Sequence, residues 1–325
     1  DFCLSRGLGD VYKRQTVNLG QSTAQTSAGH ASGDVLLNIE NLTGSGFADL
    51  ITASSTANAI DGGGDIDTVS YQNSTLGVTV DLSLSTAQTS TGDASGDVLT
   101  NVENLTGSNQ ADTLRGTSGT NTILGGTGND VIEGRAGADT LDGGDNTDTL
   151  SYENSTAGVT VSLFNGSTGS TGDASGDTIT NFENLTGSGQ VDTLTGDNTN
   201  NVILGLAGND VLEGRGGADT IDGGADTDTV SYANSAAGVN IDLTVTTAQA
   251  AGGDGAGDVL SNIESLTGSG HADTLGGNAG VNAISGGAGN DTIEGRAGGD
   301  TLDGGDDIDT LSYANSSAGV LVYLD

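Results

Sequence analysis

The sequence predicts an all-β fold in which short strands alternate with glycine-rich turns, and three observations support this prediction. Large aliphatic residues recur every nine positions, for example at Leu105, Leu114, Ile123, Ile132 and Leu141. Glycine makes up 57 of 325 residues, whereas proline is absent. Only 33% of residues are apolar, against roughly 45–50% in a typical soluble domain, so one large core is not expected. Small tandem units that bury their aliphatic residues against one another fit all three observations.

Residues 1–15 stand apart from the rest of the chain. They contain its only cysteine, Cys3, and its only lysine, Lys13, and they match no later segment. They resemble translated sequencing-adapter read-through, so we exclude them as a non-native scar from the prediction of the fold. The chain contains no methionine and stops partway through a recurring phrase, and we therefore expect it to be a fragment.

A long repeat organises everything after residue 15. The phrase that begins at Gly77 (GVTVDL) returns at Gly158, Gly238 and Gly319, so its spacing is nearly constant and close to the length of nine nonapeptides. The expected divisions are repeat unit 1 (16–78), unit 2 (79–159), unit 3 (160–239), unit 4 (240–320) and a truncated start of unit 5 (321–325). Unit 1 is shorter than unit 2 by the length of two nonapeptides, which indicates that two nonapeptides form one removable coil.

Each repeat unit contains a series of nonapeptides. Residues 125–133 (GGTGNDVIE) fit the pattern Gly-Gly-x-Gly-x-Asp-x-U-x, where U is a large aliphatic residue. Positions 7–9 favour a short strand with the aliphatic residue inward, and the six preceding Gly/Asp-rich positions favour a turn. Between the nonapeptide blocks lies a linking element, rich in Ser, Thr and Gly, that is about as long as two nonapeptides; residues 80–97 are an example. Its alternating start favours a strand with one buried face, but the sequence leaves open whether it continues the stack or bulges from it.

These nonapeptides resemble the RTX (haemolysin-type) calcium-binding repeat family over most of residues 16–325. The family's fold is a parallel β-roll, a β-solenoid with two nonapeptides per right-handed coil. The resemblance therefore implies an all-β parallel β-roll that is interrupted by the linking elements. It also implies that Ca²⁺ lies between neighbouring turns, bound by the sixth-position Asp and by main-chain carbonyls.

The sequence passes a test of this expectation, because sixth-position carboxylates recur at a spacing of two nonapeptides, which is one coil. Calcium takes six to eight oxygen ligands, which carboxylates and backbone carbonyls can supply. The series are Asp49 and Asp67; Asp112, Asp130 and Asp148; Asp192, Asp210 and Asp228; and Asp273, Asp291 and Asp309. Their adjacent members form seven candidate pairs on one side of the roll. A merely solvated acidic surface is the alternative, but stacked carboxylates would repel one another without a cation.

The other side of the roll is expected to bind calcium less well. Its predicted ligands are Asp139, Asp219 and Asp300. Weaker ligands there are Asn121, Asn201 and Asn282, which supply oxygen without charge, and Glu103, Glu183 and Glu264, which follow a segment without glycine. In repeat unit 1 the equivalent positions hold Glu40 and Asn58.

Three further residue types recur at fixed positions. Arg135, Arg215 and Arg296 replace the second glycine of a nonapeptide, two residues after a glutamate, and are expected to form surface ion pairs. Threonines at position 7 should face outward, where an ordered array could bind ice or glycans. Tyrosines that follow each last nonapeptide are expected to cap the core; they are Tyr71, Tyr152, Tyr232 and Tyr313.

The net charge of the chain and the motifs in its sequence restrict the classes of function that it can have. The net charge of −37 should repel nucleic acid and anionic membranes, and no stretch is apolar enough for a membrane span. The catalytic motifs HExxH and GxSxG are absent from the sequence, so we expect a non-catalytic segment of a larger bacterial secreted or surface protein of toxin or adhesin type. The expected cofactor is Ca²⁺, and the resemblance implies the type I secretion machinery as a partner besides the parent protein's other domains. The alternatives are an accessory roll of a secreted hydrolase or polysaccharide-modifying enzyme and, more remotely, an ice- or glycan-binding threonine array.

Overall fold

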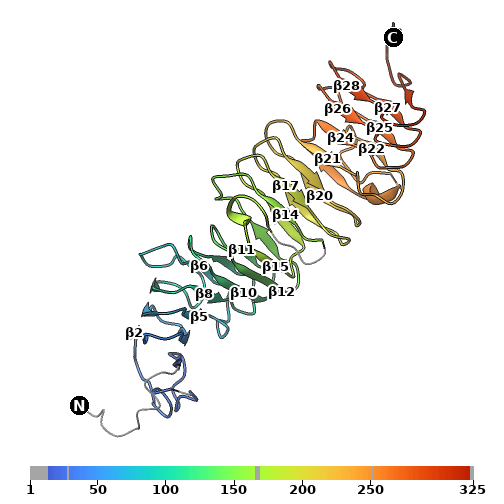
Figure 1. Cartoon of the computed structure of the whole chain (residues 1–325). Helices are drawn as coiled ribbons and strands as arrows, with labels where there is room; N and C mark the ends of the chain where they lie inside the picture. Colours follow the sequence, from blue (N-terminus) through green and yellow to red (C-terminus); the bar gives the residue numbers. More distant parts are fainter. Residues whose placement is uncertain (1–13, 28, 165–168, 251, 323–325) are drawn as a thin grey trace. The chain divides into compact units, whose positions relative to one another are not determined.

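The computed structural model describes residues 14–27, 29–164, 169–250 and 252–322 (Figure 1). The prediction for residues 1–15 therefore falls almost wholly outside the described residues. The chain divides into an N-terminal body, residues 1–151 and 174–182, and a C-terminal body, residues 152–173 and 183–325. In the described part of the chain, no helix has the length and apolar character that a membrane crossing needs.

Three parallel sheets build the N-terminal body. The first runs β1 (Thr16–Asn18), β3 (Leu50–Thr52), β5 (Thr68–Ser70), β8 (Asn104–Thr106), β10 (Thr122–Thr127), β12 (Thr140–Asp145) and β15 (Thr178–Thr180). The second runs β2 (Asn41–Thr43), β4 (Ala59–Asp61) and β7 (Val98–Thr100). The third contains β6 (Thr79–Asp81), β9 (Thr113–Arg115), β11 (Val131–Glu133) and β13 (Thr149–Ser151).

The C-terminal body repeats this design. One sheet runs β14 (Thr160–Ser162), β17 (Thr193–Thr195), β19 (Val211–Glu213), β21 (Thr229–Ser231), β24 (Ser265–Thr267), β26 (Ala283–Ser285) and β28 (Thr301–Asp303). Another contains β16 (Asn184–Thr186), β18 (Val202–Leu204), β20 (Thr220–Asp222) and β23 (Val259–Ser261). The third contains β22 (Asn240–Asp242), β25 (Thr274–Gly276), β27 (Thr292–Glu294) and β29 (Thr310–Leu311). The described residues also include two short 3₁₀ turns, η1 (Gly172–Ala174) and η2 (Gly253–Gly255).

The nine-residue aliphatic period produces the core. Successive side chains of a strand point to opposite faces, so the middle residue of a three-residue strand is buried. Ile123, Ile132, Leu141 and Leu150 are all 0% exposed. Ile123 pairs with Leu141, and Ile132 pairs with Leu150, each two nonapeptides further along the chain. The chain therefore folds as an all-β parallel β-roll with two nonapeptides per coil, as predicted.

The linking element is flanked by strands that continue the roll, and between them it forms a loop outside the sheets. β6 overlaps its start, β7 directly follows its end, and the loop between them returns along β6. Gln88 lies in this loop and is buried, and its side-chain amide bonds the backbone N–H and C=O of Asp81 at 2.9 Å each. Gln25 and Gln249 bond Asn18 and Asp242 in the same way. These glutamines act as a neighbouring strand would and cover the exposed edge of a sheet.

This element also corrects the expected assignment of sides. The sequence places Asp67 on the same side as Asp112, yet β5, which follows Asp67, pairs with β8, which follows Glu103. β6 pairs with β9 and β7 pairs with β4, so both strands lie on the side opposite β5 and β8, and the sides exchange at each repeat boundary. Adjacent pairs within a repeat unit are unaffected.

Candidate metal sites

The sixth residue of each nonapeptide lies directly before a strand and contacts its counterpart in the next coil. The backbone N–H of Asp112 donates to Oδ1 of Asp130 at 2.8 Å, and that of Asp130 donates to Oδ1 of Asp148 at 2.7 Å. All seven predicted pairs make this bond, at 2.7–3.0 Å. The fold thus brings each predicted pair of carboxylates into adjacent coils.

The turns that carry these residues are of two kinds, which the shared nonapeptide motif conceals. In the first kind, which we call left-handed turns, positions 2 and 4 both have φ between 65° and 145°. They span residues 62–67, 125–130, 134–139, 143–148, 205–210, 214–219, 223–228, 286–291, 295–300 and 304–309. Glycine adopts such φ values readily, as at Gly126 and Gly128, whereas Leu206 does so at a steric cost.

The second kind, which we call closed turns, has a polar side chain at position 2 and ordinary φ values. Four are serine turns that end in Asp49, Asp112, Asp192 and Asp273. In each, the backbone N–H of the serine donates to Oδ2 of the Asp at 2.5–2.6 Å, and its hydroxyl donates to Oδ1 at 2.8–3.1 Å. The other four are asparagine turns that end in Asn58, Asn121, Asn201 and Asn282.

The second carboxylate oxygen distinguishes the two kinds of turn. Buried Oδ2 atoms that receive no hydrogen bond belong to aspartates of left-handed turns; among the described residues they include Asp67, Asp130, Asp210, Asp219, Asp228 and Asp291. The second residue of these six turns has φ between 65° and 114°, and these Oδ2 atoms do not receive the backbone N–H that a serine turn supplies. An unpaired buried acceptor costs roughly 1–3 kcal/mol, so these oxygens need a partner.

The glycine at position 1 lies beside this oxygen and beside a main-chain carbonyl of the next coil. A Cβ atom on Gly125 would come within 2.3 Å of Oδ2 of Asp130 and within 2.4 Å of the carbonyl oxygen of Gly143 in the next coil. Gly205 and Gly286 have matching surroundings. A carboxylate oxygen and a main-chain carbonyl oxygen thus both lie beside this glycine, and an oxygen-only donor set suits a hard cation such as Ca²⁺.

Burial and mutual repulsion oppose ionisation of these carboxylates in the absence of a cation. The pKa of Asp130 is raised from 3.8 to about 7, mainly by burial and further by the charges of Asp112 and Asp148. The pKa of Asp210 is also raised to about 7, and that of Asp67 to about 6, with burial again the largest cause. A bound divalent cation would reverse this effect by favouring the charged form.

Side chains alone do not complete a metal site. Within the described ranges, no three His, Cys, Asp or Glu side chains converge closely enough to hold a metal ion. Any ion between these turns would therefore draw on main-chain carbonyls, which is chemistry that Ca²⁺ accepts and that zinc sites built from Cys and His do not use.

The residues expected on the other side are placed as follows. Oδ1 of Asn121 accepts the Thr117 N–H at 2.7 Å, and Asn201 and Asn282 are held in the same way by Asp197 and Asn278. The backbone N–H groups of Asn121, Asn201 and Asn282 donate to Oδ1 of Asp139, Asp219 and Asp300.

Two of the three predicted glutamates take the place of a sixth-position aspartate at a repeat boundary. A carboxylate oxygen of Glu103 accepts the N–H of Asp67, and one of Glu264 accepts that of Asp228, at 2.9 and 3.0 Å. The backbone carbonyl of Glu183 accepts the amide N–H of Asn201 at 2.6 Å.

Three aspartates that contact these turns were not predicted from the sequence. Asp97, Asp177 and Asp258 each accept the N–H of a sixth-position residue in the preceding coil. The hydroxyls of Tyr71 and Tyr232 donate to Oδ2 of Asp97 and Asp258 at 2.9 and 2.8 Å, so a protein donor satisfies that oxygen. Each of these aspartates lies two residues before a buried aliphatic residue, which is the pattern that could have identified it. The linking element, however, separates each from its hydrogen-bond partner by about twice the usual spacing of two nonapeptides. The tyrosines thus join the core, except Tyr313, which is 37% exposed.

The arginines pair differently from expectation. Arg135 bonds Asp81 at 2.8 Å, and Arg296 bonds both carboxylate oxygens of Asp242, in each case across three coils' length of sequence. Arg215 lies over the ring of Phe164 and 3.7 Å from Glu213, because Ser162 occupies the position of Asp81 in that repeat. A strand-edge carboxylate and not the preceding glutamate is therefore the partner in two of three repeats.

Comparison with known proteins agrees with this geometry. A family model that describes four copies of the RTX calcium-binding nonapeptide repeat matches residues 38–69, 102–125, 115–150, 195–230 and 276–311. A search of curated proteins finds no match to the chain.

Proposed function

Because the chain carries RTX calcium-binding nonapeptide repeats, we propose that it is a calcium-dependent structural segment of a larger secreted or cell-surface bacterial protein. The proposed ligands are the sixth-position aspartates together with glycine carbonyls of adjacent coils. The observation that carries the proposal is the set of buried Oδ2 atoms without donors; those of Asp130, Asp210 and Asp291 lie beside a glycine that is also close to a glycine carbonyl of the next coil.

The proposed mechanism links folding to calcium binding. At low calcium, stacked carboxylates in a chain of net charge −37 oppose compaction. At extracellular calcium concentrations, bound ions neutralise the stacked carboxylates and stabilise the folded state by mass action. Such a switch suits a protein that is exported unfolded, as through a type I system, and orders outside the cell. The toxin, adhesin or hydrolase activity would belong to other parts of the parent protein.

Circular dichroism tests this mechanism directly. The chain is titrated with CaCl₂ after extensive chelation, with MgCl₂ at equal ionic strength as the control. We expect strand signal to rise with calcium, to fall on chelation and to respond weakly to magnesium, which demands near-ideal octahedral geometry and dehydrates reluctantly. A full strand signal that ignores both calcium and chelator would contradict the proposal.

A further inference from the structure

We propose that calcium binds only between left-handed turns, and that in the closed turns the chain's own N–H groups replace the ion. This inference rests on the proposed function and restricts it to particular turns. It reduces the seven predicted pairs to three.

The serine turn that ends in Asp273 shows how donors replace a metal. Asp273 is 3% exposed, and its Oδ2 accepts the Ser269 N–H at 2.6 Å. Its Oδ1 accepts the Ser269 hydroxyl at 2.8 Å and the Val239 N–H at 2.7 Å. Both oxygens of this buried carboxylate are thus stabilised by protein donors, and hydrogen bonds of this kind stabilise the charged form without a cation.

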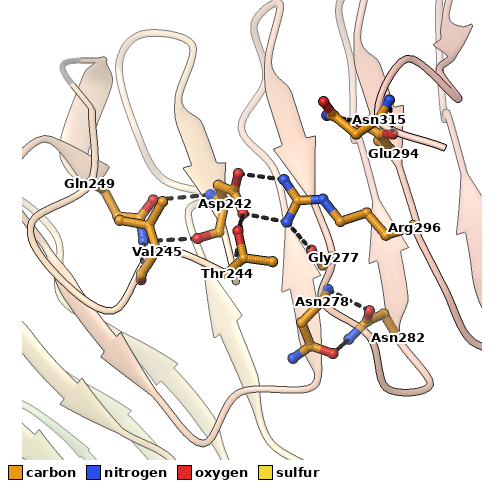
Figure 2. Close-up of polar contacts among 10 residues, drawn as sticks. All are labelled: Asp242, Thr244, Val245, Gln249, Gly277, Asn278, Asn282, Glu294, Arg296 and Asn315. Carbon is orange, nitrogen blue, oxygen red and sulfur yellow. Dashed lines mark hydrogen bonds and ion pairs between the residues drawn. The ribbon is translucent and has the colours of Figure 1, made fainter. Parts of the chain in front are cut away.

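In the asparagine turn that ends in Asn282, protein donors likewise satisfy the oxygen atoms of the turn (Figure 2). Oδ1 of Asn282 accepts the Asn278 N–H at 2.9 Å. The amide N–H of Asn282 donates to the carbonyl of Glu264 at 3.0 Å. Arg296 donates to the carbonyl of Gly277, the first residue of this turn, at 2.7 Å. The oxygens that correspond to metal ligands in a left-handed turn therefore already accept protein N–H groups.

The left-handed turn that ends in Asp291 lacks these donors. Its second residue, Gly287, has φ 100°, and Oδ2 of Asp291 is buried without a hydrogen bond. This oxygen and the carbonyl of Gly304 lie beside Gly286, just as Oδ2 of Asp273 and the carbonyl of Gly286 lie beside Gly268. Asp273 and Asp291 lie one coil apart on the same side of the roll, in what we call one column of turns. The turn type is therefore the difference between them.

Only some neighbouring coils offer two left-handed turns in one column. They are the turns of Asp130 with Asp148, Asp210 with Asp228, and Asp291 with Asp309. Asp67 adjoins the serine turn of Asp49, while Asp139, Asp219 and Asp300 each adjoin an asparagine turn. Each of these four positions therefore lacks a second open turn on that side.

Matched substitutions in one column test the inference. The number of bound Ca²⁺ ions is measured by equilibrium dialysis for the full chain and for the variants Asp273→Asn and Asp291→Asn, with circular dichroism at saturating calcium as a check on folding. We expect Asp273→Asn to leave the count unchanged, because Asn already closes four turns of this chain. We expect Asp291→Asn to lower it by one.

A gain of binding provides the converse test. The double variant Ser269→Gly/His271→Gly gives the turn the sequence GGGGAD, which permits left-handed residues at positions 2 and 4. We expect one additional bound ion, between Asp273 and Asp291. A loss of one ion in Asp273→Asn, or no gain in the double variant when it is folded, would overturn the inference while leaving the proposed function intact. Absence of calcium binding by the unmodified chain would instead overturn the proposed function. The pair Asp192→Asn and Asp210→Asn repeats the comparison in the preceding repeat should an Asp291 variant fail to fold.

Discussion

Whether the second carboxylate oxygen of the sixth-position aspartate receives a hydrogen bond determines whether a turn needs a cation. Oδ1 of a sixth-position aspartate always meets a backbone N–H of the preceding coil, so it contributes to the roll with or without metal. Oδ2 accepts a serine N–H in the four serine turns, whereas that of Asp67, Asp130, Asp210, Asp219, Asp228 and Asp291 is buried without a hydrogen bond. Only in the second case does folding leave an unsatisfied charge that a cation can neutralise.

These buried carboxylates make the calcium-free fold sensitive to pH. The pKa values of Asp130 and Asp210 are about 7 in the folded chain, against 3.8 for an ordinary Asp, so the folded state binds more protons between these limits. Stability of the metal-free roll should therefore fall as pH rises from about 4 to 7. Thermal melts in chelator at pH 5 and pH 8 should show more residual order at pH 5, and the reverse order would contradict the assignment. With calcium present, acidification should weaken order, because protons compete for the same oxygens.

The tyrosine that follows each nonapeptide block satisfies an acceptor as well as filling space. Tyr232→Phe removes the donor to Oδ2 of Asp258, which is 0% exposed, and should cost roughly 1–3 kcal/mol of unfolding free energy. Denaturant unfolding at saturating calcium measures this cost. Tyr313→Phe, at an exposed tyrosine, is the control and should change stability by less than about 0.5 kcal/mol. Equal effects of the two variants would exclude the proposed role of the buried hydroxyl.

We expect the turns, and not the strands, to determine which metal the roll binds. The first residue of such a turn must be glycine, because a side chain would not fit there. Gly286→Ala would place a methyl carbon within about 2.4 Å of both Oδ2 of Asp291 and the carbonyl of Gly304. We expect this variant to weaken calcium binding at least tenfold and to lower the melting temperature in calcium. Gly270→Ala, where a Cβ would meet nothing within 4 Å, is the matched control and should behave as the unmodified chain in calorimetric titration. Unchanged calcium affinity in Gly286→Ala would argue against an ion at this position.

The linking elements protect the strand edges of the sheets. Gln249 is 5% exposed, and its amide bonds the N–H and C=O of Asp242 in β22 (Figure 2). Gln249→Ala should cost about 1–3 kcal/mol, because several hydrogen bonds of roughly 0.5–1.5 kcal/mol are lost together. Chemical denaturation with Gln72→Ala, at an exposed side chain, as the control checks the value. A loss no greater than that of the control would show that the loop does not hold this edge.

Sequence periodicity was sufficient to predict the strands, the inward aliphatic residues and the seven aspartate pairs, because each follows from a fixed nine-residue spacing. It could not predict the exchange of sides at repeat boundaries, since that depends on β6 and β7 lying on the same side of the roll. Nor could it separate Asp273 from Asp291, because both occupy position 6. Their difference arises from the φ angles of positions 2 and 4 and from the serine donor, which act through geometry and not through spacing.

Across the molecule, the two kinds of turn divide the roll into segments with different requirements. Closed turns, tyrosine-capped aspartates and glutamine-covered edges are satisfied by the chain itself. Left-handed turns concentrate unsatisfied oxygens in the later coils of a repeat unit. We therefore expect calcium to complete a partly self-sufficient framework and not to hold every coil, so the loss of order on chelation should be graded along each repeat.

Anomalous X-ray diffraction from crystals of the calcium-bound chain tests the central claim most directly, because it locates each ion relative to named oxygens. We predict calcium peaks between Asp130 and Asp148, between Asp210 and Asp228, and between Asp291 and Asp309. Each ion should contact an Oδ2 atom and glycine carbonyls of adjacent coils. Absence of calcium from all three positions, with Oδ2 of Asp130 and Asp210 bonded to protein donors instead, would contradict the account.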